Sequence, residues 1–441
     1  MVVAVERQRY GALLAVLCGA IFLEGVDIAM MNVALPSIRA DLGLSTGALQ
    51  WVMSAYVLGY GGFMLLGGRA GDLFGRRRVF LFWLTVFILF SGLGAIAGDG
   101  WTLITARFVT GVAAAFLTPA GLSIITTTLP EGPVRERALM IYAGTAAAGF
   151  SLGLVIGGVL TAIDWRWVFL APVIFALCLL AGAIPLIPRD PRTTRSFRDI
   201  DFVGAISVTA ALVLLVLTIE RAPHASLVST AVSGAASLAL FALFVLWERR
   251  AAQPLVRLGI LRSVRLVHAN LTTLLVAAGF FGFQFVAVLY LREVLGWSTL
   301  ETSFMMLAIG LDAVLAPTLT PRLTARFGHR RVIIVGVLLA VLAYALFLPV
   351  SPDWGFAAMF PTMVLLGVSF AFAYGPLTIT ATDGAAESEH GLASGLLYTS
   401  FQFGAALGLS AVTGALALGL HAALVVPLVC ALLAAVTALR S

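Results

Sequence analysis

Fourteen stretches of the sequence are apolar for long enough to cross a lipid bilayer, and no other feature restricts the fold as strongly. A helix needs about 20 apolar residues to cross the hydrocarbon core, and backbone polar groups in lipid must be satisfied within the segment. Each stretch is therefore predicted to be a membrane-spanning helix. The first is expected to be an uncleaved span and not a signal peptide, because no small-x-small cleavage site ends it. The predicted spans are residues 11–35, 48–66, 79–97, 101–126, 138–161, 167–187, 202–219, 227–247, 267–291, 300–319, 332–350, 355–377, 392–416 and 419–439.

The composition excludes a water-soluble protein. Of the 441 residues, 61% are hydrophobic and only 11% are charged, whereas a soluble domain carries about 25% charged residues. The net charge of +6 comes from arginines in short loops, which favours a membrane over nucleic acid as the partner. Cys18, Cys178 and Cys430 lie far apart in apolar stretches, so neither a disulfide framework nor a metal site is expected.

The positions of the 27 arginines predict the orientation of the chain. If the N-terminus is placed inside, the outer loops hold only Arg39, Arg166, Arg221 and Arg292, and Arg107 falls within a span. All other arginines then lie in inner segments. Loops rich in arginine stay in the cytoplasm. We therefore predict a multi-pass protein of the cell (inner or plasma) membrane with an even number of spans and both termini in the cytoplasm.

An internal repeat divides the chain. The segment RAGDLFGRRRV (69–79) is similar to RLTARFGHRRV (322–332), and each lies between two apolar spans on the predicted inner face. The offset is too large for six spans alone, so two spans are inserted between the halves. We predict an N-terminal six-helix bundle (1–190), a two-helix insertion with cytoplasmic flanking segments (191–260) and a C-terminal six-helix bundle (261–441). Repeated halves are typical of transporters, whose substrate site lies between them.

The segment GRAGDLFGRRR, Gly68 to Arg78, resembles the loop between spans 2 and 3 of the major facilitator superfamily, and the chain as a whole resembles its fourteen-span drug:proton antiporters. The resemblance implies an all-α major facilitator fold, with two six-helix bundles and two extra helices between them. It also implies that this loop closes the cytoplasmic side through Gly68, Asp72, Gly75, Arg76 and Arg77.

The glycines of this loop allow a tight turn, and Asp72 can favour a helix N-terminus in one conformation. Ala70 and Leu73 depart from the family pattern, so one contact of the closed state is expected to be absent. The alternative is an arginine-rich loop with no switching role.

Two acids lie inside the first span, in FLEGVDIAMMNVALP (22–36). Glu24 and Asp27 are three residues apart and share a helix face, so they are expected to titrate as a coupled unit that shares a proton. The stretch resembles the first-span motif of the antiporters, which implies that Asp27, helped by Glu24, carries the coupled proton. The alternative is that neighbouring helices satisfy both acids without any role in transport.

A buried arginine is predicted in the fourth span. LITARFVTGVAAA (103–115) resembles a family motif that contains an arginine and then a glycine, here Arg107 and Gly111. A charge at the bilayer centre costs about 2.5–3.5 kcal/mol or more, so Arg107 should face the interior with a partner. The resemblance implies that it is the counter-charge of the acids. The alternative is an arginine that reaches the outer interface.

The fifth span carries a stripe of small residues, Gly149, Gly153 and Gly157, with Gly158 adjacent. Such a stripe lets another helix pack closely. It resembles the antiporter motif of this span, but Leu154 replaces the expected proline, so we expect a weaker kink. The alternative is a general packing face.

Other polar and aromatic residues are candidates for the substrate cavity. Aromatic side chains can form walls for cationic ligands, and polar groups within spans can line a cavity. A packing or interface role is the alternative for each. The candidates are Asn32, Trp51, Tyr56, Phe281, Gln284, Asp312, Tyr374 and Gln402.

The resemblance implies secondary active export of a drug, antibiotic or other lipophilic or cationic small molecule in exchange for protons, by alternating access. No phosphate-binding G-x-x-x-x-G-K-S/T motif is present, so ATP is not expected to drive transport directly. The expected energy source is the proton gradient, and no cofactor is expected. We expect no enzyme activity, since no nucleophile–base set or paired metal-binding acids are found. The expected partners are the substrate, protons and the bilayer, and the chain is expected to be a monomer. The alternative is a facilitator, or an exporter of an endogenous metabolite without strict antiport.

Overall fold

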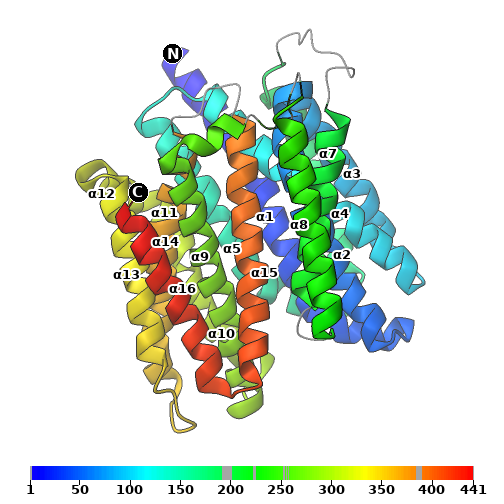
Figure 1. The fold of residues 1–441 in the computed structure, drawn as a ribbon, viewed down its shortest axis with the longest axis vertical. Coiled ribbons are helices and arrows are strands. Elements are labelled where there is room, and N and C mark those ends of the chain that lie inside the picture. Colours follow the sequence, from blue (N-terminus) through cyan, green and yellow to red (C-terminus); the bar gives the residue numbers. More distant parts are fainter. Residues whose placement is uncertain are drawn as a thin grey trace.

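The computed structural model describes residues 2–190, 201–221, 225–251, 254, 256, 258–383 and 390–440. Helices make up these residues, without any strand among them, as the apolar runs predict. Most are long and run side by side as a bundle (Figure 1). The predicted boundary at 190 adjoins a segment outside the described residues, and the division at 190 and 260 stays a prediction.

The first half contains six helices: α1 (Val2–Leu42), α2 (Thr46–Phe74), α3 (Arg76–Ala95), α4 (Gly100–Thr128), α5 (Pro133–Ile163) and α6 (Trp167–Leu186). Ser45 and Asp99 cap α2 and α4 by accepting hydrogen bonds from the backbone N–H groups of Ala48 and Thr102, as small polar residues do at helix N-termini. In this half α1 packs along α5, and α2 packs along α4.

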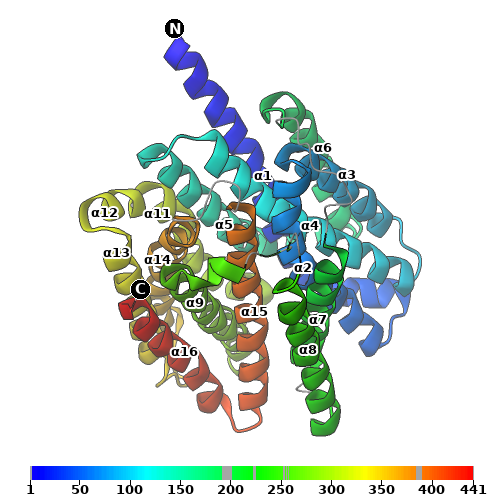
Figure 2. The ribbon, with the colours of Figure 1, turned by 45° about the horizontal axis from the view of Figure 1, so that its top comes forward.

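An antiparallel pair of helices follows, α7 (Phe202–Arg221) and α8 (Leu227–Glu248). It stands beside α2 and α15 in both views of the ribbon (Figures 1 and 2). Contacts with both halves hold it there. Val213 and Val216 fill the space above Gly62 and Gly61 of α2, and Ser410 of α15 donates a hydrogen bond to the carbonyl of Ile219.

The second half repeats the pattern of the first with more interruptions. The turn between α2 and α3 has its counterpart between α12 and α13, because Gly75 and Gly328 both have positive φ, 98° and 82°, which glycine adopts without strain. The predicted repeat is therefore visible as a repeated turn. The elements are η2 (Leu258–Arg262), α9 (Val264–Leu289), η3 (Tyr290–Val294), α10 (Thr299–Leu307), η4 (Ala308–Leu311), α11 (Asp312–Thr318), α12 (Thr320–Phe327), α13 (His329–Phe347), α14 (Phe356–Thr382), α15 (His390–Leu416) and α16 (Leu420–Arg440).

Among the described residues, 11 helices are long and apolar enough to cross a membrane, and two bent helix pairs raise this number to 13. A shorter apolar helix covers Val203–Ile219. Each predicted run coincides with one of these elements, which confirms an all-α, multi-pass membrane protein. The count of fourteen stays a prediction, because this last helix is shorter than a full span.

The expectation that the fifth span kinks less than one with a proline stays a prediction. Helix α5 bends by 41° between Phe150 and Val155, although it has no proline at that point. The bend falls within the glycine stripe, and glycine is one of the residues at which helices kink without proline. A second bend, of 54°, separates Phe304–Thr318 from Thr320–Phe327.

One end of the bundle carries the arginine-rich turns at residues 69–78 and 322–331, and we call it the Arg-rich end. The C-terminus of α14 and the N-termini of α5 and α15 also lie at this end. The sequence predicts that it is the cytoplasmic side. Here the two halves touch closely, since a methyl group built at Gly375 of α14 would lie 3.2 Å from Cγ of Met140 in α5.

Candidate functional site

A buried ion pair joins the first and fourth helices. Nη1 of Arg107 lies 2.5 Å from Oδ2 of Asp27, and both residues are only 1% exposed. The Arg107 guanidinium also sits 4.3 Å from the centre of the Tyr56 ring of α2, close enough for a cation–π interaction. The prediction that Arg107 faces the interior is confirmed, and its alternative as an interface arginine is excluded.

Close approach of α2 and α4 places Arg107 over Tyr56. A methyl group built at Gly111 would lie 2.3 Å from the carbonyl oxygen of Tyr56, and one built at Gly59 would lie 2.4 Å from the carbonyl oxygen of Phe108. Only glycine fits at these two contacts. The glycine of the fourth-span motif therefore has a packing role next to the ion pair.

Glu24 has different surroundings from Asp27, although it lies only one helical turn away. Its Oε2 atom is 2.9 Å from the Tyr60 hydroxyl and 2.5 Å from the Thr118 hydroxyl. Its Oε1 atom finds no hydrogen-bond partner within the described residues. The side chain is 3% exposed, and both groups that donate to it are neutral hydroxyls.

The hydroxyl groups around Glu24 form a small network. The oxygens of Tyr60 and Thr118 are 3.0 Å apart, and Tyr142 of α5 donates to the carbonyl of Thr118. Each hydroxyl carries a single proton, so the direction of these bonds can change with the protonation of Glu24. Sequence reasoning did not single out Thr118; the only available signal was a polar residue in the run of small residues within α4.

The glycine stripe of α5 brings the acids to their place. Methyl groups built at Gly149, Gly153 and Gly157 would lie 2.5 to 2.8 Å from atoms of α1, at Phe22, at Val26 and Ala29, and at Met30. These residues flank Glu24 and Asp27 in the sequence. A methyl group at Gly158 would meet nothing within 4 Å, so this glycine is not part of the contact. The side chain of Leu154 lies outside the described residues.

The predicted gate motif contacts the second half at the Arg-rich end. A methyl group at Gly68 would lie 2.5 Å from the carbonyl oxygen of Gly391 in α15. The Asp72 carboxylate lies against the first turn of α15, since a methyl group built at Gly391 would lie 2.8 Å from its Oδ2 atom, and the helix dipole favours an anion at this position. Arg76 lies 3.3 Å from the same carboxylate. The Arg-rich end is thus closed between α2 and α15.

Two other residues of this motif stabilise the first half internally. Arg77 donates to the carbonyl groups of Ile184 and Ile187 at the end of α6. Asp190 accepts hydrogen bonds from the backbone N–H groups of Arg77 and Arg78, and a methyl group on Gly75 would collide with its carboxylate. Gly75 and Arg77 therefore hold α3 against α6 and do not bridge the halves.

Aromatic rings from three helices of the second half meet the first half. Phe281 of α9 packs edge-to-face on Phe150 of α5, with ring centres 6.0 Å apart, and on Phe401 of α15. Tyr374 of α14 lies 4.8 Å from the Phe401 ring. Phe281 and Tyr374, which the sequence proposed as cavity residues, therefore belong to one aromatic cluster at the interface of the halves.

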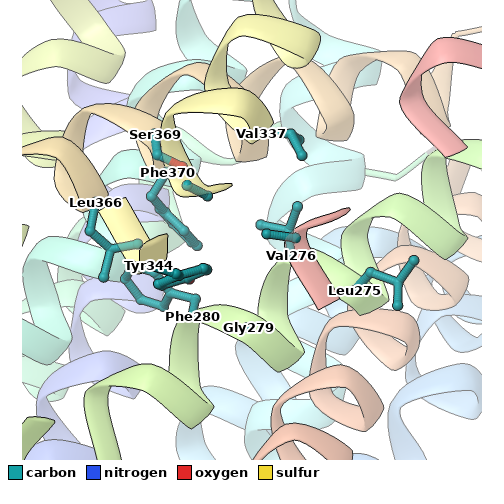
Figure 3. A pocket seen from close by; sticks show the side chains of 11 residues that line it. Leu275, Val276, Gly279, Phe280, Val337, Tyr344, Leu366, Ser369 and Phe370 are labelled. Atoms are coloured by element: carbon teal, nitrogen blue, oxygen red, sulfur yellow. The ribbon is translucent and has the colours of Figure 1, made fainter. Parts of the chain in front are cut away.

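The second half also encloses a small apolar cavity between α9, α13, α14 and α16. Tyr344, Phe280 and Phe370 form its wall, with Val276 and Ser369 nearby (Figure 3). Its volume is about 10 Å³. A drug-sized ligand needs a pocket of about 300 Å³ or more, so this cavity is a packing defect and not the substrate site.

The remaining candidates are scattered. Trp51 lies under Arg221 of α7, 4.7 Å from the guanidinium to the ring centre, and so contacts the inserted helices. Asp312 is 2% exposed and begins α11 directly after the 3₁₀ turn η4. Gln284 and Gln402 are partly buried. The side chain of Asn32 lies outside the described residues. A substrate role for these residues stays a prediction.

Comparison with known proteins agrees with this architecture. The Major Facilitator Superfamily model matches residues 17–409 and 313–440. Two solved structures share the fold: a human organic anion transporter, MFSD10 (TM-score 0.71, 16% identity, covering 97% of this chain and 99% of that one), and the proton:xylose symporter XylE (TM-score 0.70, 14% identity, covering 98% and 96%).

Sequence relatives include three proteins of Streptomyces and Amycolatopsis species. The puromycin resistance protein of Streptomyces alboniger is 35% identical over 92% of this chain and 81% of its own length. The cephamycin export protein of Amycolatopsis lactamdurans is 35% identical over 90% and 83%. The tetracenomycin C resistance and export protein of Streptomyces glaucescens is 29% identical over 93% and 76%. The chain belongs to the major facilitator superfamily.

Proposed function

We propose that the protein is a secondary active exporter of an antibiotic or another lipophilic or cationic small molecule, driven by proton entry. It would lie in the plasma membrane with the Arg-rich end in the cytoplasm. The names of the relatives support antibiotic export, since they describe resistance to puromycin and export of cephamycin and tetracenomycin C. The two buried acids of α1 support the proton coupling.

The observation that carries proton coupling is the difference between the two acids. Asp27 has a cation, Arg107, at 2.5 Å, so the pair is neutral as a unit. Glu24 is also buried, and among the described residues its hydrogen bonds come from two hydroxyl groups. A buried charge without a counter-charge is strongly unfavourable. We assign the exchangeable proton to Glu24 in this closed state, with Asp27 and Arg107 as the neighbouring pair that responds to it.

Exchange follows from alternation between two states. In the state described here the Arg-rich end is closed by the contacts of Gly68 and Asp72 with α15. Loss of the Glu24 proton would leave a second negative charge one turn from Asp27. Arg107 would then be attracted by both acids, and the α1–α4 contact would change. This coupling links the protonation of Glu24 to the packing of the bundle that opens toward the cytoplasm.

A test uses proteoliposomes with a pH-sensitive dye inside and puromycin as the probe. Addition of puromycin should move protons in the wild type. Glu24→Gln should abolish this movement and retain puromycin–puromycin exchange, because a permanently neutral side chain mimics the protonated acid. Glu293→Gln, the same change at an exposed position, is the control. Unchanged proton movement in Glu24→Gln would refute the assignment.

A second candidate is an exporter of a self-made metabolite that does not require strict antiport. One relative favours it, because the name of the tetracenomycin C resistance and export protein pairs resistance with export. The same liposomes separate the two functions. Puromycin transport that continues without a proton gradient and moves no protons would support the second.

A further inference from the structure

A cavity of about 350 Å³ lies between the two halves at the Arg-rich end. Glu131, Arg135 and Glu136 line it from the turn before α5 and the start of α5, and Asp383 and His390 line it from α14 and α15. We call it the inner vestibule. Thr126 of α4 also lines it. This residue follows Thr118 of the Glu24 network by eight positions, so the vestibule begins roughly 12 Å from that network along the helix axis.

The charges of the inner vestibule do not cancel. Arg135 is paired within its own turn, since its guanidinium lies 3.2 Å from the Glu131 carboxylate and donates to the carbonyl of Leu129. Two acids remain, Glu136 from the first half and Asp383 from the second. His329 of α13 lies 3.7 Å from Glu136, and His329 and His390 add positive charge only when protonated.

The surrounding groups also affect Asp383. Burial is the main cause that raises the pKa of this carboxyl, with Glu136 and Glu131 acting in the same direction and His329 and Arg135 acting against them. A group of this kind ionises more readily when a cation approaches. A cation bound in the vestibule would therefore favour the ionised form of Asp383.

The size and donor set of the vestibule favour an organic cation. Its volume falls in the range of pockets that hold drug-sized molecules, about 300–1,000 Å³. The search of the described residues finds no group of three or more His, Cys, Asp or Glu side chains that could hold a metal ion. Acids on opposite halves leave room for a bulky charged group between them.

We propose that the inner vestibule is a loading site for organic cations, in which Glu136 and Asp383 attract the positive charge of a substrate before the halves part. The inference rests on the proposed export function and specifies its substrate class. It also explains why an acidic hollow lies on the face of the molecule that is otherwise rich in arginine. As the halves separate, the two acids separate too, and the cation is released into the space that opens between the halves.

The test measures equilibrium binding of tetraphenylphosphonium to the full chain in nanodiscs of neutral lipid at pH 7.5. Asp383→Asn and Glu136→Gln should each weaken binding about fivefold, the effect of losing one solvent-screened charge near the ligand. Asp353→Asn is the control, because this acid lies exposed in the loop before α14 at the opposite end.

The outcomes are distinct. Weaker binding in both variants, with the control unchanged, supports the site. Unchanged binding in both variants, equal weakening in Asp353→Asn, or no binding to the wild type overturns it. If only Glu24→Gln abolishes binding, the cation binds deeper and the vestibule is not its site. Proton coupling is tested separately by the Glu24 variant, so either proposal can fail alone.

Discussion

Removal of the Asp27 charge should destabilise the protein far more than removal of the Glu24 charge. Asp27→Asn leaves the Arg107 guanidinium, 1% exposed, without its counter-charge. Breaking a buried ion pair by loss of one partner costs about 3–5 kcal/mol. The face of Tyr56, 4.3 Å away, still stabilises the cation by about 1–2 kcal/mol. We therefore expect the free energy of unfolding to fall by about 3 kcal/mol, near the lower end of this range.

Glu24→Gln provides the matched comparison on the same helix. A glutamine oxygen can still accept hydrogen bonds from Tyr60 and Thr118, so the loss should be about 1 kcal/mol or less. The double variant Asp27→Asn/Arg107→Gln removes both charges together. It should lose less than the sum of the two single variants by about 2 kcal/mol, as expected for residues in direct contact.

Unfolding in mixed micelles with an increasing fraction of SDS, followed by tryptophan fluorescence at pH 7.5, measures these differences. The wild type, the three single variants at positions 24, 27 and 107, and the double variant form a complete set. Equal losses for Asp27→Asn and Glu24→Gln, or strict additivity of the Asp27 and Arg107 changes, would refute the view that only Asp27 is held as a buried ion pair.

Three further outcomes are expected. Gly153→Val should reduce the yield of monodisperse protein and destabilise it by about 1–3 kcal/mol, since overpacking forces α1 and α5 apart. Gly158→Ala is the control and should behave as wild type in the SDS titration, because no atom lies within 4 Å of the added methyl group. The double variant Met140→Cys/Gly375→Cys, in a background without the three native cysteines, should form a disulfide, because the Cβ positions are 3.8 Å apart and disulfides need about 3.5–4.5 Å. Transport should stop on oxidation and return with reductant. Transport that continues in the oxidised protein would contradict closure of the Arg-rich end at this point. Burial raises the pKa of Asp383 above its ordinary 3.8, so its ionised form lowers the free energy of unfolding above the raised pKa, and this destabilisation disappears as pH falls through that pKa toward 3.8. Asp383→Asn should therefore unfold at a higher SDS fraction than wild type at pH 8, with a difference that shrinks on acidification. A difference that grows on acidification would contradict this sign.

Several features of this protein could be read from the chain without coordinates. Apolar runs of about 20 residues predict spanning helices because lipid cannot satisfy backbone polar groups. The repeat of the arginine-rich segment predicted two related halves, and both copies contain a glycine with positive φ, Gly75 and Gly328. A lone charge in the bilayer core is energetically unfavourable, which indicated that Arg107 must face a partner. These are local rules, so a single segment is enough to apply them.

What only the tertiary structure decided is which segments meet. Glu24 finds Tyr60 and Thr118, 36 and 94 residues away in the chain, while Asp27 finds Arg107 at a separation of 80. The sequence predicted that the two acids form one coupled unit, but among the described residues helix packing pairs Asp27 with a cation and Glu24 with two hydroxyl groups. Packing likewise bends α5 without a proline, turns Arg77 toward α6, and joins acids of both halves at the inner vestibule. Such pairings depend on how faces of distant helices are apposed, and this is set by close contact between glycine-lined surfaces across the whole bundle.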